Sequence, residues 1–106
     1  MAAIRSARLS QDWINCGDPI EITVEIEFIG PPTEVAVVLE IQAPCRFRDG
    51  SDAIKVRKNG PSPQTVRLVE AISGPSGVTH FPRLRITAIE KSQQPFRVFR
   101  DLEVRC

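Results

Sequence analysis

Hydrophobic and polar residues alternate along much of this chain with the period of two that is typical of β-strands. The alternation is clearest at residues 20–29, where Ile, Val and Phe occupy the even positions and Glu or Thr most of the odd ones. A Gly-Pro-Pro turn follows, and the pattern resumes over residues 33–42. Both segments are predicted to be strands with one buried face and one face in water.

Five further segments are predicted to be strands, and Gly, Pro, Ser or Asn residues separate them. In the last of these segments, Arg100 interrupts the alternation, so a bulge or a change of strand partner is expected there. The five segments are residues 4–9, 54–58, 64–72, 83–90 and 95–105.

These strands predict an all-β fold. No window carries the i, i+3, i+4, i+7 pattern of an amphipathic helix, and nine prolines and six glycines punctuate the chain. Seven strands in 106 residues indicate a seven-stranded antiparallel two-sheet sandwich of the immunoglobulin-like type. Residues 1–106 are predicted to form a single domain. Because a strand-like segment reaches the last residue, we also expect a module excised from a longer protein.

The segment Gly17–Ile26 reads Gly-Asp-Pro-Ile-Glu-Ile-Thr-Val-Glu-Ile and precedes a Gly-Pro turn. It resembles the opening of bacterial immunoglobulin-like modules, such as the cell-adhesion-related family and the carbohydrate-binding C-terminal domains of polysaccharide ABC transporters. The resemblance covers about the first half of the chain and implies an immunoglobulin-like or fibronectin type III-like sandwich. It assigns no site residues, and the Cys, Trp, Cys spacing of antibody domains is absent.

Segments 33–42, 83–90 and 95–105 are expected to lie side by side and to expose an apolar strip on their outer face. In the register that the turn lengths suggest, Glu40 lies opposite Arg83. An exposed apolar strip indicates a protein contact, so we predict a non-enzymatic protein-protein interaction or assembly module. Its partner would be a protein or a second copy of the chain, as in a homodimer. The predicted contact residues are Phe99 as the anchor, Val38, Ala36 and Ile89 around it, and the rim charges Arg85 and Arg97.

Net charge gives no reason to expect nucleic acid as the partner. Fourteen basic and thirteen acidic residues leave a formal charge of +1. The bases concentrate between residues 43 and 68, where they either hold an anionic partner or protect an edge strand. Phe47 is the one aromatic residue among them, and stacking on bases needs aromatic residues, so nucleic-acid binding is not expected. The alternative anionic-partner patch comprises Arg46, Arg48, Lys55, Arg57 and Lys58.

Side chains suited to catalysis are few, because the chain contains one histidine and no tyrosine. Cys45 and His80 are the simplest candidate catalytic pair, but no third orienting group or oxyanion hole is predicted beside them. We therefore expect no enzymatic activity and no cofactor.

The strand directions place Cys16, Cys45, Cys106 and His80 at one pole of the sandwich. Three interpretations of these residues are possible: reduced thiols, a disulfide between two of the cysteines, or a zinc site. Reduced thiols are the simplest reading of an odd cysteine count, and the absence of a Cys-x-x-Cys pair argues against zinc.

An alternative function is a carbohydrate- or peptide-binding sandwich that uses two loops at the opposite pole, residues 30–33 and 91–95. Trp13 is either a lid over the core or a platform for a sugar ring. The chain has neither the apolar run of a secretory signal nor that of a membrane span, so a cytoplasmic location without membrane contact is expected.

Overall fold

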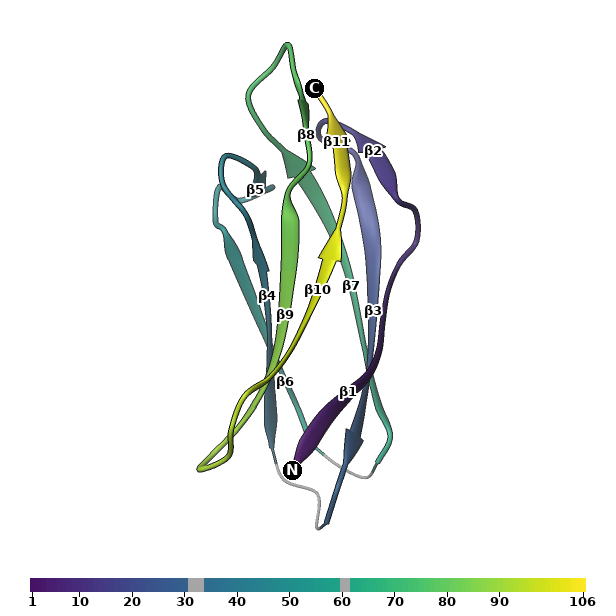
Figure 1. Cartoon of the computed structure of the whole chain (residues 1–106), viewed down its shortest axis with the longest axis vertical. Coiled ribbons are helices and arrows are strands. Elements are labelled where there is room, and N and C mark those ends of the chain that lie inside the picture. Colours follow the sequence, from purple (N-terminus) through teal and green to yellow (C-terminus); the bar gives the residue numbers. More distant parts are fainter. Residues whose placement is uncertain (31–33, 60–61) are drawn as a thin grey trace.

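The computed structural model describes residues 1–30, 34–59 and 62–106 (Figure 1). Over these residues the chain forms strands and no helix. The body is elongated, 49 × 22 × 19 Å, and its two termini lie toward opposite ends (Figure 1). The strands are β1 (Ala2–Leu9), β2 (Trp13–Asn15), β3 (Pro19–Phe28), β4 (Val35–Ile41), β5 (Arg46–Phe47), β6 (Ala53–Lys58), β7 (Gln64–Ser73), β8 (Thr79–His80), β9 (Arg83–Glu90), β10 (Phe96–Asp101) and β11 (Glu103–Arg105).

The strands form two main sheets and one small sheet. The main sheets have the orders β1-β3-β7-β5 and β10-β9-β4-β6, and all of their pairings are antiparallel. The small sheet has the order β2-β11-β8, in which β11 runs parallel to β2. The predicted all-β, antiparallel sandwich is therefore confirmed, but the described residues form eleven strands and not seven.

The difference in strand number comes from short elements. Six predicted segments correspond to β1, β3, β4, β6, β7 and β9, although position 33 of the segment predicted at 33–42 lies outside the described residues. The seventh predicted segment is divided into β10 and β11, and β2, β5 and β8 contain only two or three residues each. An element that short cannot show the alternation on which strand prediction depends.

The change of strand partner expected at Arg100 is confirmed. β10 pairs with β9 as far as Asp101, and β11 then pairs with β2 and β8. Between the two strands, Leu102 turns into the core. The Arg100 guanidinium Nε donates a 2.9 Å hydrogen bond to the Ala7 carbonyl of β1, which ties the crossing point to the other main sheet.

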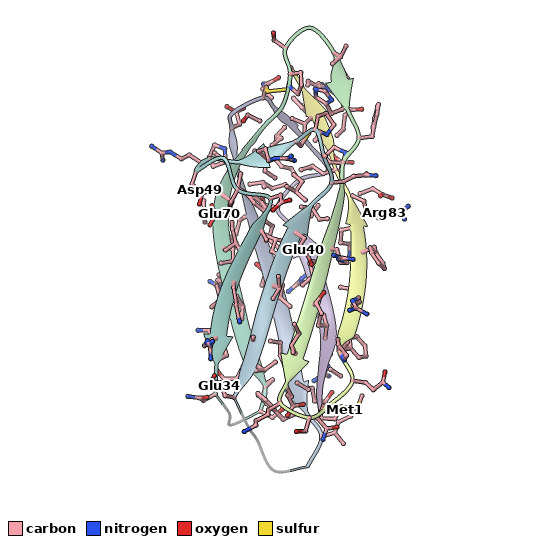
Figure 2. The ribbon with its side chains drawn as sticks, turned by 90° about the vertical axis from the view of Figure 1, so that its left-hand side faces the viewer. Met1, Glu34, Glu40, Asp49, Glu70 and Arg83 are labelled. Carbon is pink, nitrogen blue, oxygen red and sulfur yellow. A yellow bond between two sulfur atoms is a disulfide. The ribbon has the colours of Figure 1, made fainter. Side chains whose placement is uncertain are left out.

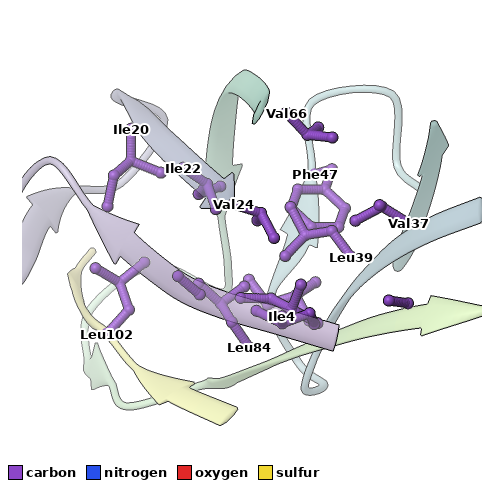
Figure 3. Packing of buried hydrophobic residues seen from close by; sticks show 14 of the residues in the cluster. Ile4, Ile20, Ile22, Val24, Val37, Leu39, Phe47, Val66, Leu84 and Leu102 are labelled. Carbon is purple, nitrogen blue, oxygen red and sulfur yellow. The ribbon is translucent and has the colours of Figure 1, made fainter. Parts of the chain in front are cut away.

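The core lies between the two main sheets and is filled by the alternate residues of each strand (Figure 3). Every second residue of β3 is almost completely buried, as its period of two predicts. Phe47, on the short strand β5, is also buried between the sheets. The largest completely buried side chains include Phe47, Ile14, Ile20, Ile22, Ile26, Leu39, Ile72, Leu84, Ile86 and Leu102.

The strands β4, β9 and β10 are neighbours, as predicted, but their register differs from the predicted one by two residues. Glu40 lies opposite Arg85, not Arg83, and Phe99 also lies opposite Arg85. A slip of two residues leaves every side chain on its predicted face, because neighbouring residues of a strand point to opposite faces.

The described residues include no helix that is long and apolar enough to cross a membrane.

Candidate functional site

The residues predicted as a contact surface all lie on the outward side of the sheet β10-β9-β4-β6, hereafter the outer face. Figure 2 looks onto this sheet, with Glu40 and Arg83 labelled on it. Ala36 lies opposite Ile89, and Ile89 is 39% exposed. Phe99 is 49% exposed but lies two outward rows away, opposite Arg85. These rows are about 13 Å apart along the strands. The predicted continuous apolar strip is therefore two separate apolar spots on one face.

Three arginines of the outer face are held by carboxylates. Arg85 Nε and Nη2 donate hydrogen bonds of 3.1 and 2.6 Å to the two carboxylate oxygens of Glu40. This fork raises the pKa of Arg85, since Glu40 stabilises its charged form. Arg83 Nε lies 3.4 Å from the Asp101 carboxylate. At the far end of the face, Arg57 Nη1 lies 2.8 Å from the Glu34 carboxylate.

Among the residues that the structure describes, two cations on the strands of the outer face have no such carboxylate. Lys55, Val38, Thr87 and Arg97 follow one another in a row across the four strands. Neither Lys55 nor Arg97 forms an ion pair within residues 1–30, 34–59 and 62–106. Three strand spacings, about 14 Å, separate their backbones. This row, named the cationic row, presents two unneutralised charges to solvent.

The opposite main sheet offers a useful comparison. On its outer side, Arg8, Thr23 and Arg67 form a similar row. Glu21 and Glu25 lie on either side of Thr23 along β3, two residues before and after it. The acids on β3 oppose the field of these two arginines. On β4, Val38 of the cationic row has Ala36 two residues before it and Glu40, whose carboxylate is held by Arg85, two residues after it. The two faces of the sandwich thus differ in their local charge.

The predicted anionic-partner patch does not form one surface. Lys55 and Arg57 point outward from β6, while Lys58 is partly buried on the other side of the strand. Arg46 lies on β5 in the other main sheet, and its Nη1 donates to the Cys45 carbonyl at 2.9 Å. Arg48 lines a hollow beside the start of β3 and the end of β7. Only Lys55 and Arg57 therefore contribute to the outer face.

Two hollows lie on the outer face, one toward each end of the sheet β10-β9-β4-β6. The larger, of about 850 Å³, has Ala36 and Ile89 in its lining together with Arg57 and Lys91. The smaller, of about 280 Å³, is lined by six residues at the other end of the sheet, namely Glu40, Ile41, Gln42, Arg83, Arg85 and Phe99. Each hollow therefore combines apolar surface with cations and carboxylates, since Glu34 and Glu90 also line the larger hollow and Glu40 lines the smaller.

Thr87 is an unusual polar residue in the middle of the cationic row. It is 3% exposed, and its hydroxyl makes no hydrogen bond with any part of the chain that the structure describes. A buried hydroxyl without a partner costs about 1–3 kcal/mol. Its position between Val38 and Arg97 places this cost on the face that carries the free cations.

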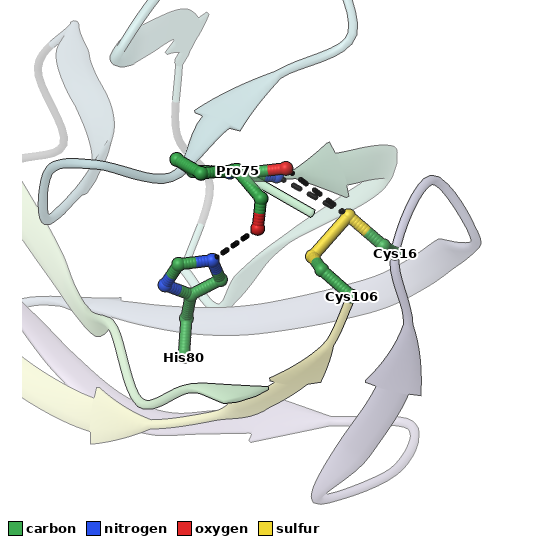
Figure 4. The surroundings of a disulfide bond; sticks show 5 residues. Cys16, Pro75, His80 and Cys106 are labelled. Atoms are coloured by element: carbon green, nitrogen blue, oxygen red, sulfur yellow. Dashed lines mark hydrogen bonds between the residues drawn. A yellow bond between two sulfur atoms is a disulfide. The ribbon is translucent and has the colours of Figure 1, made fainter. Parts of the chain in front are cut away.

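The cysteines do lie at one pole, as predicted, but the prediction that they are reduced thiols is wrong for two of them. Cys16 and Cys106 form a disulfide with Cα atoms 4.6 Å apart (Figure 4). Their sulfurs cannot then serve as zinc ligands, and the described residues contain no group of three or more His, Cys, Asp or Glu that could hold a metal. The parallel pairing of β2 with β11 brings the two cysteines together, since each follows the end of one of these strands.

Cys45 and His80 are near each other, because both approach Gly74. Cys45 is completely buried, and burial raises the pKa of its thiol. His80 Nε2 lies 2.8 Å from the Pro75 carbonyl oxygen, which engages that ring nitrogen (Figure 4). A protonated, inaccessible thiol is a poor nucleophile, so this pair does not have the geometry of a Cys-His catalytic centre.

The residues of the alternative ligand site are divided. Residues 31–33 of one predicted loop lie outside the described residues, while Lys91, Ser92 and Gln93 of the other line the larger hollow. Trp13 is 40% exposed, and the guanidinium of Arg105 lies 3.8 Å from its ring centroid. Trp13 is thus partly covered by a cation and is not an open platform.

No family model matches this chain, and no curated protein matches it. A solved structure, titled "Pseudomonas fluorescens alkylpurine DNA glycosylase AlkC bound to DNA containing an abasic site analog", shares its fold with a TM-score of 0.68 and 14% sequence identity. The match covers 99% of this chain and 30% of the glycosylase chain. At this identity the likeness concerns the fold.

The comparison corrects two predictions from the sequence. The chain was expected not to be an enzyme, and its partner was expected to be a protein or a second copy rather than nucleic acid. The protein with which it shares its fold is a DNA glycosylase and is bound to DNA in that structure. This finding counts against both predictions, and neither is kept. The first prediction relied on the small number of catalytic side chains, and the second on net charge and on the single aromatic residue among the bases. These properties of the sequence do not report how side chains are placed on a folded surface.

Proposed function

We propose that this chain is a DNA-binding β-sandwich that serves an enzyme acting on DNA, and that its outer face contacts the DNA backbone. The glycosylase whose fold it shares is more than three times its length, which supports a role as one part of such an enzyme. The strand orders β1-β3-β7 and β10-β9-β4-β6 also support the resemblance to immunoglobulin-like and fibronectin type III-like modules.

The observation that carries this proposal is the cationic row. DNA phosphates attract lysine and arginine, and each phosphate that is neutralised releases counterions. Lys55 and Arg97 can donate to phosphate without first breaking an ion pair with a described residue. Arg83, Arg85 and Arg57 would have to share their guanidinium groups with carboxylates, so we expect smaller contributions from them.

The outer face, which was predicted to bind a protein, is therefore proposed to bind DNA. Its apolar residues line hollows beside the cations, where sugars and bases could pack. On the opposite sheet, Glu21 and Glu25 would repel phosphate from the row formed by Arg8 and Arg67. DNA is accordingly expected on one face only.

The test compares two double variants that each remove two positive charges. Lys55→Gln with Arg97→Gln changes the outer face, and Arg8→Gln with Arg67→Gln is the matched control on the other sheet. The probe is a short fluorescent duplex that contains an abasic-site analogue, and anisotropy is measured over a series of salt concentrations. The slope of log K against log salt is negative, and its magnitude is expected to decrease by about 2 for the outer-face variant, since each lost phosphate contact removes about 1.

The control variant should keep the slope of the unchanged protein, and both variants should keep its circular dichroism spectrum. The proposed function is wrong if the unchanged protein does not bind the duplex. It is also wrong if the salt dependence of binding weakens by the same amount in both double variants.

A further inference from the structure

We propose that Phe99 stacks on an unpaired base, so that the outer face takes locally single-stranded DNA and not only the duplex backbone. This inference rests on the proposed function, because it names the form of DNA that the same face holds. Its starting point is that Phe99 is a half-exposed aromatic residue beside two arginines, Arg83 and Arg85, each of which is ion-paired with a carboxylate.

The surroundings of Phe99 are suited to a base. Phe99 lines the smaller hollow together with Gln42, Arg83 and Arg85. The guanidinium carbon of Arg83 lies 5.7 Å from the Phe99 ring centroid, within the range of a cation-π contact. Glu40 holds Arg85 in a fork of two hydrogen bonds. The phenyl ring therefore has fixed neighbours, and about half of its surface is still open to a ligand.

Gln42 adds a polar group for the edge of a base. Its Oε1 accepts a 3.2 Å hydrogen bond from the backbone N–H of Arg83. This bond fixes the side-chain oxygen and leaves the amide NH2 as a donor. A ring to stack on, a cation and an amide donor within one hollow form a combination that fits a nucleobase better than it fits a phosphate group.

The spacing between this hollow and the cationic row fits a single nucleotide. Phe99 and Arg97 are two residues apart on β10 and point to the same face, so their backbones are about 7 Å apart. A phosphate at Arg97 and its base at Phe99 would then be contacts of one nucleotide. In an intact duplex the base is stacked and paired, and its flat faces are not available to Phe99. The geometry thus favours a strand that is open at this point.

Trp13 provides a matched control. It too is a partly exposed aromatic residue next to an arginine, but Arg105 lies much closer to its ring, at 3.8 Å. It also lies on β2 in the small sheet, away from the cationic row. We therefore expect Trp13 to contribute no base stacking.

The experiment uses two probes, a fluorescent oligothymidine and a fully paired duplex of the same length. Phe99→Ala is expected to weaken oligothymidine binding about tenfold, the effect of losing one base-aromatic stack, while duplex binding stays the same. Phe99→Trp should restore oligothymidine binding, and Trp13→Ala should bind both probes as the unchanged protein does. A 2-aminopurine base in the single strand should lose fluorescence on binding to the unchanged protein but not to Phe99→Ala.

Three results would overturn the inference: equal loss on both probes, no loss on either, or a loss from Trp13→Ala that matches that from Phe99→Ala. Failure here is separable from failure of the proposed function. A protein that binds duplex through the cationic row but ignores oligothymidine contradicts only the base site. A protein that binds neither probe contradicts both.

Discussion

Thr87 combines two properties that rarely occur together in the middle of a sheet. It is buried, and its hydroxyl makes no hydrogen bond with the described residues, yet it lies on the outward side of β9. The central strand β9 would be more stable with an apolar β-branched residue at this position. Sites that give up stability in this way are often sites of function. The location of Thr87 between Lys55 and Arg97 is consistent with the proposed role of the cationic row.

A stability measurement tests this view of Thr87. Thr87→Val keeps the shape of the side chain and removes the unpaired hydroxyl, so the free energy of unfolding in urea is expected to rise by about 1 kcal/mol. Thr87→Ser keeps the hydroxyl and removes a methyl group, and it should lower that free energy. A decrease for Thr87→Val would mean that the hydroxyl is hydrogen-bonded in solution.

Side-chain facing could be predicted for single residues, but their neighbours could not. The period of two correctly placed Phe99 and Ile89 outside and Leu84 inside. The residue opposite Phe99 depends on the register, and a slip of two residues preserves every facing. Phe99 was therefore expected near Ala36 and is found opposite Arg85. Its ring lies beside Arg83 and Arg85 and not within an apolar strip.

Among the elements, the small sheet β2-β11-β8 gives the C-terminal pole its structure. β2 is only three residues long, and β11 is its parallel partner. Cys16 and Cys106 follow these two strands, and the disulfide between them closes a loop across a sequence separation of 90 residues. A crosslink over so long a loop strongly reduces the conformational entropy of the unfolded chain.

Removal of the disulfide should therefore be costly. Cys16→Ser with Cys106→Ser is expected to lower the free energy of unfolding by about 4 kcal/mol, which is a large part of the stability of a small domain. Urea denaturation of the variant and of the unchanged protein measures this difference. As an independent check, the denatured, unreduced protein should titrate one thiol per chain, that of Cys45. Three titratable thiols and an unchanged stability would contradict the bond.

The sequence brought the cysteines to one pole but did not identify the bonded pair. The long strands predicted the pole, because their directions follow from the order of alternating segments. The pairing depends on β2, whose three residues carry no recognisable pattern, and on the point near Arg100 where the last strand changes partners. Because β2 was not predicted, the sequence did not indicate that Cys16 and Cys106 lie closer to each other than either lies to Cys45.

At the scale of the whole molecule, a net charge of +1 conceals two faces of different character. The outer face carries Lys55 and Arg97, which have no carboxylate partner among the described residues, and the opposite sheet interleaves its arginines with the acids of β3. Composition could not reveal this arrangement, since it depends on β6 pairing with β4 and so placing Lys55 in a row with Arg97. Nucleic acid was discounted because of the net charge and the scarcity of aromatic residues among the bases, and neither property shows where Lys55 and Arg97 lie on the folded surface.

Chemical-shift mapping by NMR tests the location of the DNA site most directly. The 15N-labelled protein is titrated with an unlabelled duplex that contains an abasic-site analogue, and backbone amide shifts are followed for every assigned residue. Perturbations are expected on the outer face, centred on Lys55, Val38, Thr87 and Arg97, while β3 and the outward residues of β7 should stay unchanged. Perturbations centred on the row of Arg8, Thr23 and Arg67, or no perturbation at concentrations of DNA that saturate non-specific binding, would contradict it.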